Sequence, residues 1–362
     1  MMTANRSAQS DAVRDQRIER LVPLITPQEL FDELPLEGDS VDTLLRGRSG
    51  AHGVLDGEDD RLLVIVGPCS VHDVDAVKEY AEKLAAQSRR LQDDLLIAMR
   101  VYFEKPRTTI GWKGLINDPH LDGSFDVNAG LRIARALMLE ILGVGLPIGC
   151  EFLDPITPQY ISDLVSWGAI GARTTESQIH RQLGSGLSMP VGFKNRTDGN
   201  VQVAVDAVRA AAAAHAFAGI DADGRSAILH TRGNKDCHII LRGGDAGTNF
   251  DAESVAKAVE LLRASKLRES LMIDLSHANS AKDPSRQPAI GRVVGEQVAG
   301  GDRAITGVMI ESFLVAGSQA PGPLETLTYG QSITDGCIGF DETVDVLDGL
   351  AAAVRTRRGL TA

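Results

Sequence analysis

Several residue types that would point to other classes of protein are scarce in this sequence. Four cysteines occur in 362 residues, and none belongs to a Cys-x-x-Cys pair, which argues against a disulfide framework or a zinc ribbon. No apolar run approaches the roughly 20 residues that span a membrane. The polar segment from Met1 to Arg20 also lacks the apolar core of a signal peptide. We therefore expect a protein of a reducing compartment, located in the cytoplasm.

Positive charge is in short supply as well. The 37 Lys and Arg residues are outnumbered by 49 Asp and Glu residues, which gives a net charge of -12. This balance argues against nucleic acid or an anionic membrane as a partner. The chain is long enough to bury a large core in one big domain or two modest ones. A site for anions in such a chain has to be a local concentration of Arg and Lys.

Short apolar runs alternate with segments of helical periodicity over most of the chain. Eight such runs have the length of buried parallel strands, at 62–66, 95–99, 147–150, 169–172, 191–193, 238–241, 271–273 and 306–310. Helices are expected at 73–91, 127–142, 158–167, 176–183, 200–216, 252–264 and 342–357. Eight strand–helix units predict an α/β fold of the (β/α)8 TIM barrel type. A doubly wound sheet is a weaker alternative, because no Gly-x-Gly-x-x-Gly follows the first run.

The segments outside this alternation suggest three further features. Residues 1–13 are expected to be disordered, and residues 14–60 to form an N-terminal helical extension with an interface or regulatory role, ahead of a catalytic barrel at 61–358. Thr26 to Glu29 reads as a capping box that starts one short helix, and Ser40 is a candidate cap for a second. The Gly-rich stretch 50–60 is expected to be a linker. An insert at 221–236 is expected to hold a small hairpin strand, 227–231, before the sixth barrel strand.

Charged side chains stand at or just after the ends of the apolar runs. In a barrel these strand ends converge on one mouth, so the side chains are expected to meet there. Each one alone could equally belong to a salt bridge or an exposed loop, and their recurrence is what favours a functional site. Gathering cations is costly unless an anion with about three negative charges lies among them, as in a small phosphorylated carboxylate. The five cations are Arg100, Lys105, Arg173, Lys194 and Arg242.

A second group at the strand ends has the chemistry of a metal site. One thiol, one imidazole and two carboxylates suit a first-row divalent ion, with Mn, Fe, Co and Zn all acceptable. These candidates are Cys69, His277, Glu311 and Asp335. They lie far apart in sequence, and a buried cysteine at a strand end is more often plain core than a ligand. The remaining cysteines, Cys150, Cys237 and Cys337, are interpreted as structural.

Several long strings in the sequence carry a family likeness. They are GPCSVHD at 67–73, RVYFEKPRTTIGWKGLIND at 100–118, GARTTES at 171–177, GFKN at 192–195, LRGG at 241–244 and DLSHANS at 274–280. Together they resemble the type I 3-deoxy-D-arabino-heptulosonate 7-phosphate (DAHP) synthases, in particular the feedback-regulated microbial branch. The resemblance covers about residues 14–358. Arg196 and Phe313 depart from the common pattern of that family, and neither is one of the catalytic positions that the resemblance implies.

The resemblance implies a transferase of the shikimate pathway, which leads to chorismate and the aromatic amino acids. Such an enzyme condenses phosphoenolpyruvate, D-erythrose 4-phosphate and water to DAHP and phosphate. The five cations then correspond to the phosphoenolpyruvate cradle, and the thiol, imidazole and two carboxylates to the metal ligands. Pro106, Arg107 and Thr108 correspond to the grip on erythrose 4-phosphate. Glu151 is expected to position the attacking water, and Lys105 to protonate the alkoxide, with a pKa lowered by neighbouring cations.

The resemblance also implies regulation and assembly. Relatives carry an aromatic-amino-acid pocket between the N-terminal extension and positions that match Gln159, Leu183, Leu187 and Ser188 here. Feedback by Phe or Tyr and a homodimer or homotetramer are therefore expected, although the extension could instead serve a subunit interface alone. The alternative functions are 3-deoxy-D-manno-octulosonate 8-phosphate synthase and a non-catalytic barrel that senses phosphoenolpyruvate. The string Lys105 to Thr108 and the N-terminal extension argue against the first, and the complete set of cations and metal donors argues against the second.

Overall fold

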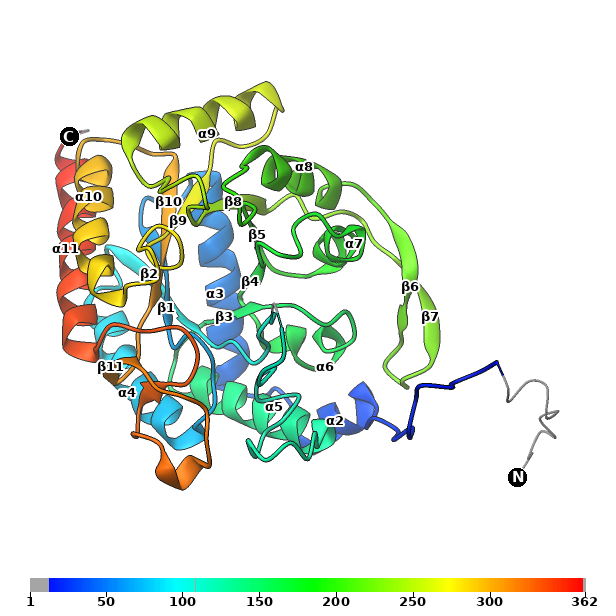
Figure 1. The fold of residues 1–362 in the computed structure, drawn as a ribbon. Helices are drawn as coiled ribbons and strands as arrows, with labels where there is room; N and C mark the ends of the chain where they lie inside the picture. The colour runs from blue at the N-terminus through cyan, green and yellow to red at the C-terminus, as the bar shows by residue number, and fades with distance from the viewer. Residues whose placement is uncertain (1–12, 108, 361–362) are drawn as a thin grey trace.

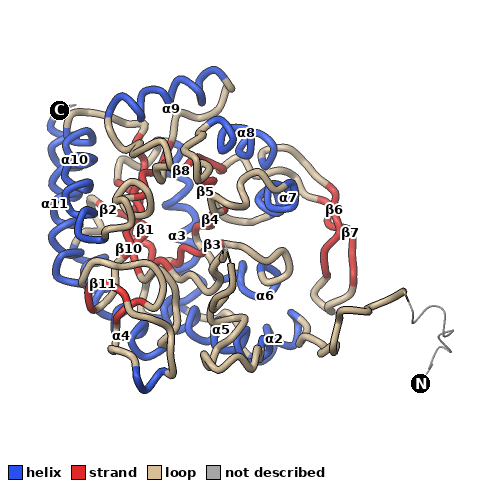
Figure 2. The backbone as a smooth tube through the Cα atoms, viewed as in Figure 1, coloured by secondary structure: helices blue, strands red, loops and turns tan. Residues whose placement is uncertain are grey.

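The chain folds around a closed barrel of eight parallel strands, as the sequence predicts (Figures 1 and 2). The computed structural model describes residues 13–107 and 109–360, so most of the segment expected to be disordered lies outside the described part. The barrel strands are β1 (Leu62–Gly67), β2 (Leu95–Arg100), β3 (Ile148–Glu151), β4 (Trp167–Ile170), β5 (Val191–Lys194), β8 (Cys237–Leu241), β9 (Leu271–Asp274) and β10 (Ile305–Glu311). They pair in chain order, and β10 closes the barrel against β1.

Alternation along each strand divides the core into two layers. On β1, Leu62, Val64 and Val66 pack outward against the helices, whereas Leu63 and Ile65 pack inside the barrel. The inner layer also contains Trp167 and Met309, so the barrel is filled with side chains and has no pore. Because the interior is filled, functional side chains are expected at the carboxyl ends of the strands, which lie at one end of the barrel.

Helices cover the outside of the barrel (Figure 2). They are α4 (Val74–Arg90), α5 (Val127–Gly143), α6 (Pro158–Ile161), α7 (Gln178–Gly186), α8 (Gln202–Ala211), α9 (Ala252–Ala264), α10 (Gln287–Ala299) and α11 (Phe340–Gly359). All of the expected helices are present, but two end early. The one expected at 158–167 ends at Ile161, ahead of β4 at Trp167, and the one expected at 200–216 ends at Ala211, since a strand begins at Ala216. Helix α10 was not expected. The part of the structure described here contains no helix that combines the length and apolarity needed to cross a membrane.

Two helices precede the barrel within the part of the chain that the structure describes. Helix α2 (Pro27–Glu33) begins at the expected capping box, with Thr26 and Glu29 bonded reciprocally. Helix α3 (Asp39–Asp56) is capped at Gly38 rather than at Ser40, and it runs through most of the stretch expected to be a linker. Its Ala51 and Val54 join the inner core of the barrel. Burial of this face makes 50–56 helical despite its glycines, so the linker prediction is wrong for these residues.

The insert before the sixth barrel strand is a hairpin that stands out from the barrel (Figure 1). Strands β6 (Ala216–Ile220) and β7 (Ser226–His230) pair antiparallel, so the hairpin starts earlier than the insert expected at 221–236. Its turn contacts the N-terminal segment, since Gln28 N donates to Ala222 O at 2.9 Å. The short strands β11 (Val315–Ser318) and β12 (Gln331–Ser332) pair in the loop between β10 and α11.

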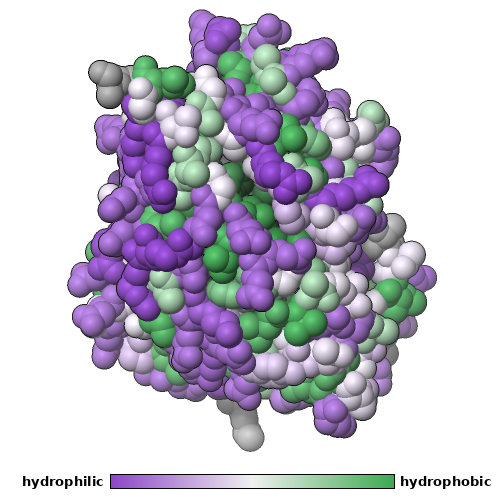
Figure 3. All heavy atoms as spheres, turned by 90° about the vertical axis from the view of Figure 1, so that its left-hand side faces the viewer, coloured by the Kyte–Doolittle hydropathy of each residue, from purple (hydrophilic) through white to green (hydrophobic). Residues whose placement is uncertain are grey.

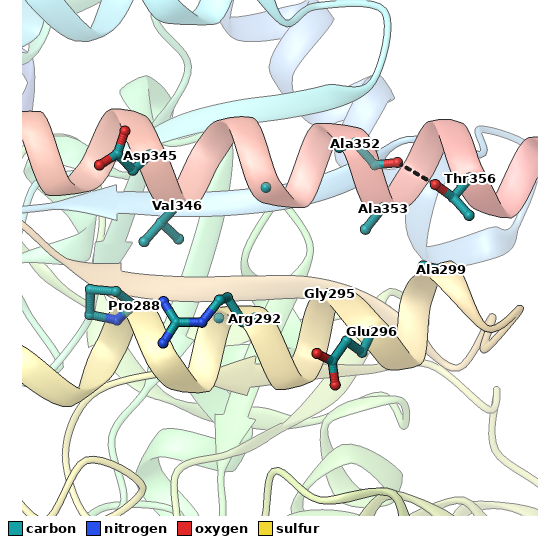
Figure 4. Close-up of a pocket in the computed structure, with 12 residues that line it drawn as sticks. Pro288, Arg292, Gly295, Glu296, Ala299, Asp345, Val346, Ala352, Ala353 and Thr356 are labelled. Atoms are coloured by element: carbon teal, nitrogen blue, oxygen red, sulfur yellow. Dashed lines mark hydrogen bonds between the residues drawn. The ribbon is translucent and has the colours of Figure 1, made fainter.

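A groove of about 510 Å³ runs between α10 and α11 on the outer wall. Small residues let the two helices approach, and a Cβ built on Gly291 would lie 3.2 Å from Val346 Cγ1. Figure 4 shows the two helices side by side, with Arg292 and Glu296 on the rim. On this face, polar side chains surround a narrow apolar strip (Figure 3). The groove lies on the side of the barrel and shares no lining residue with the mouth.

Candidate active site

The carboxyl ends of the strands bring all five sequence-predicted cations to one cavity. Its volume is about 170 Å³, and Arg100, Lys105, Arg173, Lys194 and Arg242 line it. Arg100 and Lys194 are the last residues of β2 and β5, and Arg242 follows β8 directly. Arg173 lies further out than expected, because β4 ends at Ile170 rather than at 172 and leaves Arg173 in a turn. Glu151, His277 and Asp335 line the same cavity.

Two close approaches of the backbone hold this mouth together. A Cβ on Gly67 would lie 2.6 Å from Arg100 O, so β1 and β2 can approach here only without a side chain. Likewise, a Cβ on Gly171 would lie 2.8 Å from Glu151 Oε1. These glycines fix the positions of Arg100 and Glu151 at neighbouring strand ends.

Carboxylates stand directly behind the cations. Lys194 Nζ lies 3.4 Å from Glu151 Oε2 and 3.5 Å from Asp274 Oδ2. Arg100 Nη2 donates to Glu311 Oε1 at 2.9 Å. Buried cations need such partners when no anion is bound, because an unpaired buried charge is strongly destabilising. These carboxylates therefore neutralise part of the positive charge of the five cations, which also line the cavity.

Three of the four proposed metal donors converge. One ligand atom each from Cys69, Glu311 and Asp335 lies within 4.8 Å of the others. The fourth donor, His277, stands beside them, with its Nε2 3.8 Å from Glu311 Oε1. Sulfur, nitrogen and two carboxylate oxygens around one point are the ligand types of a first-row divalent metal site. The donor set therefore fits such an ion.

The imidazole of His277 is fixed by its neighbours. Asp274 Oδ2 lies 2.8 Å from Nδ1, and Ser276 Oγ lies 2.7 Å from the same atom. His277 has φ +55°, a left-handed backbone that costs free energy in a non-glycine residue. Although burial acts to raise the pKa of Asp274, His277 and Lys194 hold that pKa well below its ordinary value. An ionised Asp274 on Nδ1 leaves Nε2 facing Glu311.

Lys105 lies between the two groups of residues. Its Nζ donates to Cys69 Sγ at 3.0 Å and to Cys69 O at 3.1 Å. Burial and Arg100 act to lower the pKa of Lys105, but Cys69 and Glu311 outweigh them, so the pKa is raised. The prediction of a lowered pKa is therefore wrong. The ammonium group of Lys105 therefore stays charged and donates a hydrogen bond to Cys69, one of the proposed metal ligands.

The pKa values of Glu151 and Cys69, also at the mouth, shift in opposite directions because their surroundings differ. Burial acts to raise the pKa of Glu151, yet Lys194, Lys105 and Arg100 hold that pKa below its ordinary value. Glu151 is thus an ionised carboxylate that can accept a proton or a hydrogen bond. Burial and Glu311 raise the pKa of the Cys69 thiol. A bound cation favours the thiolate, so metal binding and proton release at Cys69 are coupled.

The residues expected to grip erythrose 4-phosphate follow Lys105 in the loop after β2. Pro106 and Arg107 line the cavity, and Arg107 Nε donates to Trp112 O at 2.7 Å. Thr108 lies outside the described residues. Lys282 and Thr197 also line the cavity and were not predicted. Asp274 stands three residues before His277, and that spacing could have marked it as the partner of the imidazole.

The four residues of the expected effector site line one hollow of about 900 Å³, beside the hairpin. Gln159 comes from α6, Leu183 from α7, and Leu187 and Ser188 follow α7. The opposite wall is the β6–β7 hairpin, with Phe217 and Leu229 among its residues. The expectation placed the N-terminal extension there, but no described residue of that extension lines the hollow. Its Gln28 N donates to Ala222 O in the turn of the hairpin, and its Ile25 O accepts from Tyr160 Oη on α6.

The chain is similar over almost its whole length to known proteins. The DAHP synthetase I family matches residues 34–348. The Phe-sensitive phospho-2-dehydro-3-deoxyheptonate aldolase of Escherichia coli K12 is 55% identical, over 95% of this chain and 98% of that protein. The tyrosine-inhibited enzyme of Candida albicans is 51% identical, over 96% and 95%.

A solved structure agrees with these similarities. The phospho-2-dehydro-3-deoxyheptonate aldolase of Francisella tularensis SCHU S4 superposes with a TM-score of 0.93 at 50% identity, covering 94% of this chain and 100% of the other. The family match alone spans most of the barrel. The chain therefore belongs to the DAHP synthetase I family.

Proposed function

We propose that the mouth of the barrel carries out the activity of this family, the 3-deoxy-7-phosphoheptulonate synthase reaction. Phosphoenolpyruvate and D-erythrose 4-phosphate condense there with water to DAHP and phosphate. The observation that carries the proposal is the single cavity lined by five cations together with His277 and Asp335. That arrangement suits a substrate with both a phosphate and a carboxylate, held against a Lewis-acid centre.

The five cations hold phosphoenolpyruvate. Arg100, Arg173 and Arg242 offer planar guanidinium groups that match phosphate and carboxylate oxygens, and Lys105 and Lys194 add point charges. The Tyr102 ring lies 3.6 Å from the Arg100 guanidinium and fixes its plane from below. These fixed charges hold the substrate in one orientation and stabilise the negative charge that develops as phosphate leaves.

Cys69, His277, Glu311 and Asp335 hold a divalent metal ion. When bound, the ion supplies Lewis acidity that polarises the aldehyde of erythrose 4-phosphate. Pro106, Arg107 and Thr108 grip the phosphate end of that substrate. Lys105, charged and 3.0 Å from Cys69 Sγ, donates a proton to the oxygen that was the aldehyde. Glu151, ionised and facing Lys194, orients the water that adds to phosphoenolpyruvate.

The hollow at Gln159, Leu183, Leu187 and Ser188 binds an aromatic amino acid that inhibits the enzyme. Its mixed walls, with Phe217 and Leu229 opposite Gln159 and Ser188, suit an aromatic side chain that carries polar groups. Relatives of this chain are named Phe-sensitive and tyrosine-inhibited, which supports this class of effector. Activity titrated with Phe, Tyr and Trp is expected to fall for at least one of them.

The proposal is tested by product analysis with purified protein. Phosphate release from phosphoenolpyruvate is measured with erythrose 4-phosphate, with arabinose 5-phosphate and with neither, before and after chelation. We expect phosphate release from phosphoenolpyruvate only in the assay that contains erythrose 4-phosphate. Chelation should abolish this release, and added divalent metal should restore it. Turnover of arabinose 5-phosphate would favour the octulosonate synthase. Binding of phosphoenolpyruvate without release under any of these conditions would favour a sensing barrel.

A further inference from the structure

One buried carboxylate beside the active site has no part in the proposed reaction. Glu104 directly precedes Lys105 and is 3% exposed. Its Oε2 accepts hydrogen bonds from Thr157 Oγ1 at 2.9 Å, from Leu153 N at 3.3 Å and from Asp154 N at 3.4 Å. Burial raises the pKa of Glu104 to about 7, against the opposing effect of Thr157. A carboxylate is costly to bury, so its presence here suggests a purpose beyond packing.

The three donors to Glu104 lie in the connection between β3 and α6. The same connection supplies Pro155 and Ile156 to the wall of the hollow proposed to bind the effector, and α6 adds Pro158. Glu104, which adjoins the active site, therefore holds the segment that forms one wall of the hollow.

A second contact ties this connection to another wall of the hollow. His180 on α7 lies with Nε2 2.7 Å from Leu153 O, and its Nδ1 lies 2.9 Å from Ser177 Oγ. Its neighbour in the helix, Ile179, lines the hollow. Leu153 is thus held through its carbonyl by α7 and through its N–H by Glu104. A ligand that moves α7 or the connection changes the hydrogen bonds that Glu104 accepts.

The backbone around Glu104 has little room to absorb such a change. A Cβ on Gly114 would lie 1.8 Å from Phe103 O and 2.9 Å from Glu104 Cα, so the two segments are in close contact. Lys105 N donates to Lys113 O at 2.8 Å. A displacement of Glu104 is therefore passed along the chain to Lys105. Lys105 in turn contacts Cys69 and lines the cavity for phosphoenolpyruvate.

We propose that Glu104 is a positioning residue that couples occupancy of the effector hollow to the placement of Lys105. The inference rests on the proposed effector role of the hollow and adds the route by which that role reaches the active site. An amino acid in the hollow shifts the β3–α6 connection, and Glu104 transmits the shift to Lys105 and weakens phosphoenolpyruvate binding. By thermodynamic reciprocity, phosphoenolpyruvate weakens effector binding by the same factor.

The test measures this coupling in binding alone. Calorimetry at pH 8 gives the affinity of the wild-type holoenzyme for Phe, Tyr and Trp, with and without saturating phosphoenolpyruvate. The variants are Glu104→Gln, Thr157→Val and the double variant, and Glu140→Gln at an exposed position is the matched control. Circular dichroism checks that each variant is folded.

In the wild type and in Glu140→Gln, we expect phosphoenolpyruvate to weaken effector binding about 5-fold or more. In Glu104→Gln and Thr157→Val, each ligand alone binds within about 3-fold of wild type, while the coupling falls below about 2-fold. The double variant shows little further loss, because Glu104→Gln removes the charge of the acceptor and Thr157→Val removes the donor of the same hydrogen bond. A purely structural role for Glu104 would instead change the individual affinities.

Two outcomes contradict the proposal and are distinguishable. If an amino acid binds the wild type and its coupling to phosphoenolpyruvate is unchanged in both single variants, the route through Glu104 is wrong and the effector role of the hollow stands. If none of the three amino acids binds the wild type, the effector role of the hollow is wrong, and the coupling proposal is overturned with it.

Discussion

Arg100 and Glu311 form an ion pair inside the barrel, with Nη2 and Oε1 2.9 Å apart and both side chains almost completely buried. The pair joins the two halves of the proposed site, because Arg100 belongs to the anion cradle and Glu311 to the metal donors. Glu311 Oε1 also lies 3.8 Å from His277 Nε2. A change at Glu311 is therefore expected to affect the metal site, the cradle and the fold together.

Removing one partner of this pair should destabilise the protein strongly. Glu311→Ala or Arg100→Ala leaves an uncompensated buried charge, and we expect the free energy of unfolding to fall by about 3–5 kcal/mol. Urea unfolding measures the change. The matched control is Glu140→Ala, whose ion pair with Lys78 is half exposed and should contribute under about 1 kcal/mol. Equal effects at the two sites would contradict the importance of the buried pair.

Loss of a single metal donor should abolish metal-dependent turnover. Cys69→Ala and His277→Ala each remove one proposed ligand, and activity is expected to fall below detection even with added metal. Cys237→Ala is the control, since Cys237 is buried at the start of β8, away from the mouth. Phosphate release and bound metal per chain are measured for all three variants. Full activity in Cys69→Ala or His277→Ala would remove that residue from the metal site.

Asp274 should act through His277. Asp274→Asn keeps the shape of the side chain but loses the charge that lies 2.8 Å from His277 Nδ1. We expect the affinity for the divalent metal to fall about 10- to 100-fold, because loss of the group that hydrogen-bonds the other ring nitrogen of a metal-binding histidine has effects of this size. Competition with a fluorescent chelator measures the affinity. Unchanged metal affinity would show that Ser276 and the backbone suffice to orient the imidazole.

The buried Glu104 should make stability depend on pH. Its pKa is raised from 4.5 to about 7 in the folded state, so between these values the folded protein binds more protons than the unfolded chain. The stabilising contribution is present below pH 4.5 and is lost as the pH rises through 7. Relative to Glu104→Gln, the wild type should lose about 2–3 kcal/mol between pH 5 and pH 8.

Urea unfolding of both proteins at four pH values in that range tests this expectation. Glu140→Gln serves as the exposed control and should follow the wild type at every pH. Parallel stability curves for the wild type and Glu104→Gln would show that Glu104 is ionised in the folded state at a normal pKa.

Much of the fold follows from local patterns in the sequence. The apolar run of β1 and the capping box at Thr26 specify their own structures, because a short continuous apolar run suits a strand buried on both faces and local hydrogen bonds fix the helix start. Helix α10 was missed because Gly291 and Gly295 weaken its helical signal, and packing against α11 compensates for them. Residues 50–56 were misassigned for the same reason, since contact with the barrel interior overrides local propensity.

Which charged side chains contact one another in the site was harder to predict from the sequence than the fold. Which residues stand at strand ends can be read from the sequence, but the partners of a buried charge depend on the barrel register. Lys194 on β5 meets Glu151 on β3 and Asp274 on β9, each two strands away in the barrel, because side chains from alternate strands point into the same interior layer. The direction of the pKa shift of Lys105 was wrong for this reason. Cys69 and Glu311, which act to raise the pKa of Lys105, are distant from it in sequence.

The central claim is that the anion cradle and the metal donors act on substrates at one mouth. A crystal structure of the manganese-loaded protein with phosphoenolpyruvate, recorded with anomalous scattering, tests it most directly. We predict one anomalous peak per chain among Cys69, His277, Glu311 and Asp335, and phosphoenolpyruvate in the same cavity against Arg173 and Lys194. Manganese bound without Cys69 and His277, or phosphoenolpyruvate bound away from those two cations, would contradict the account.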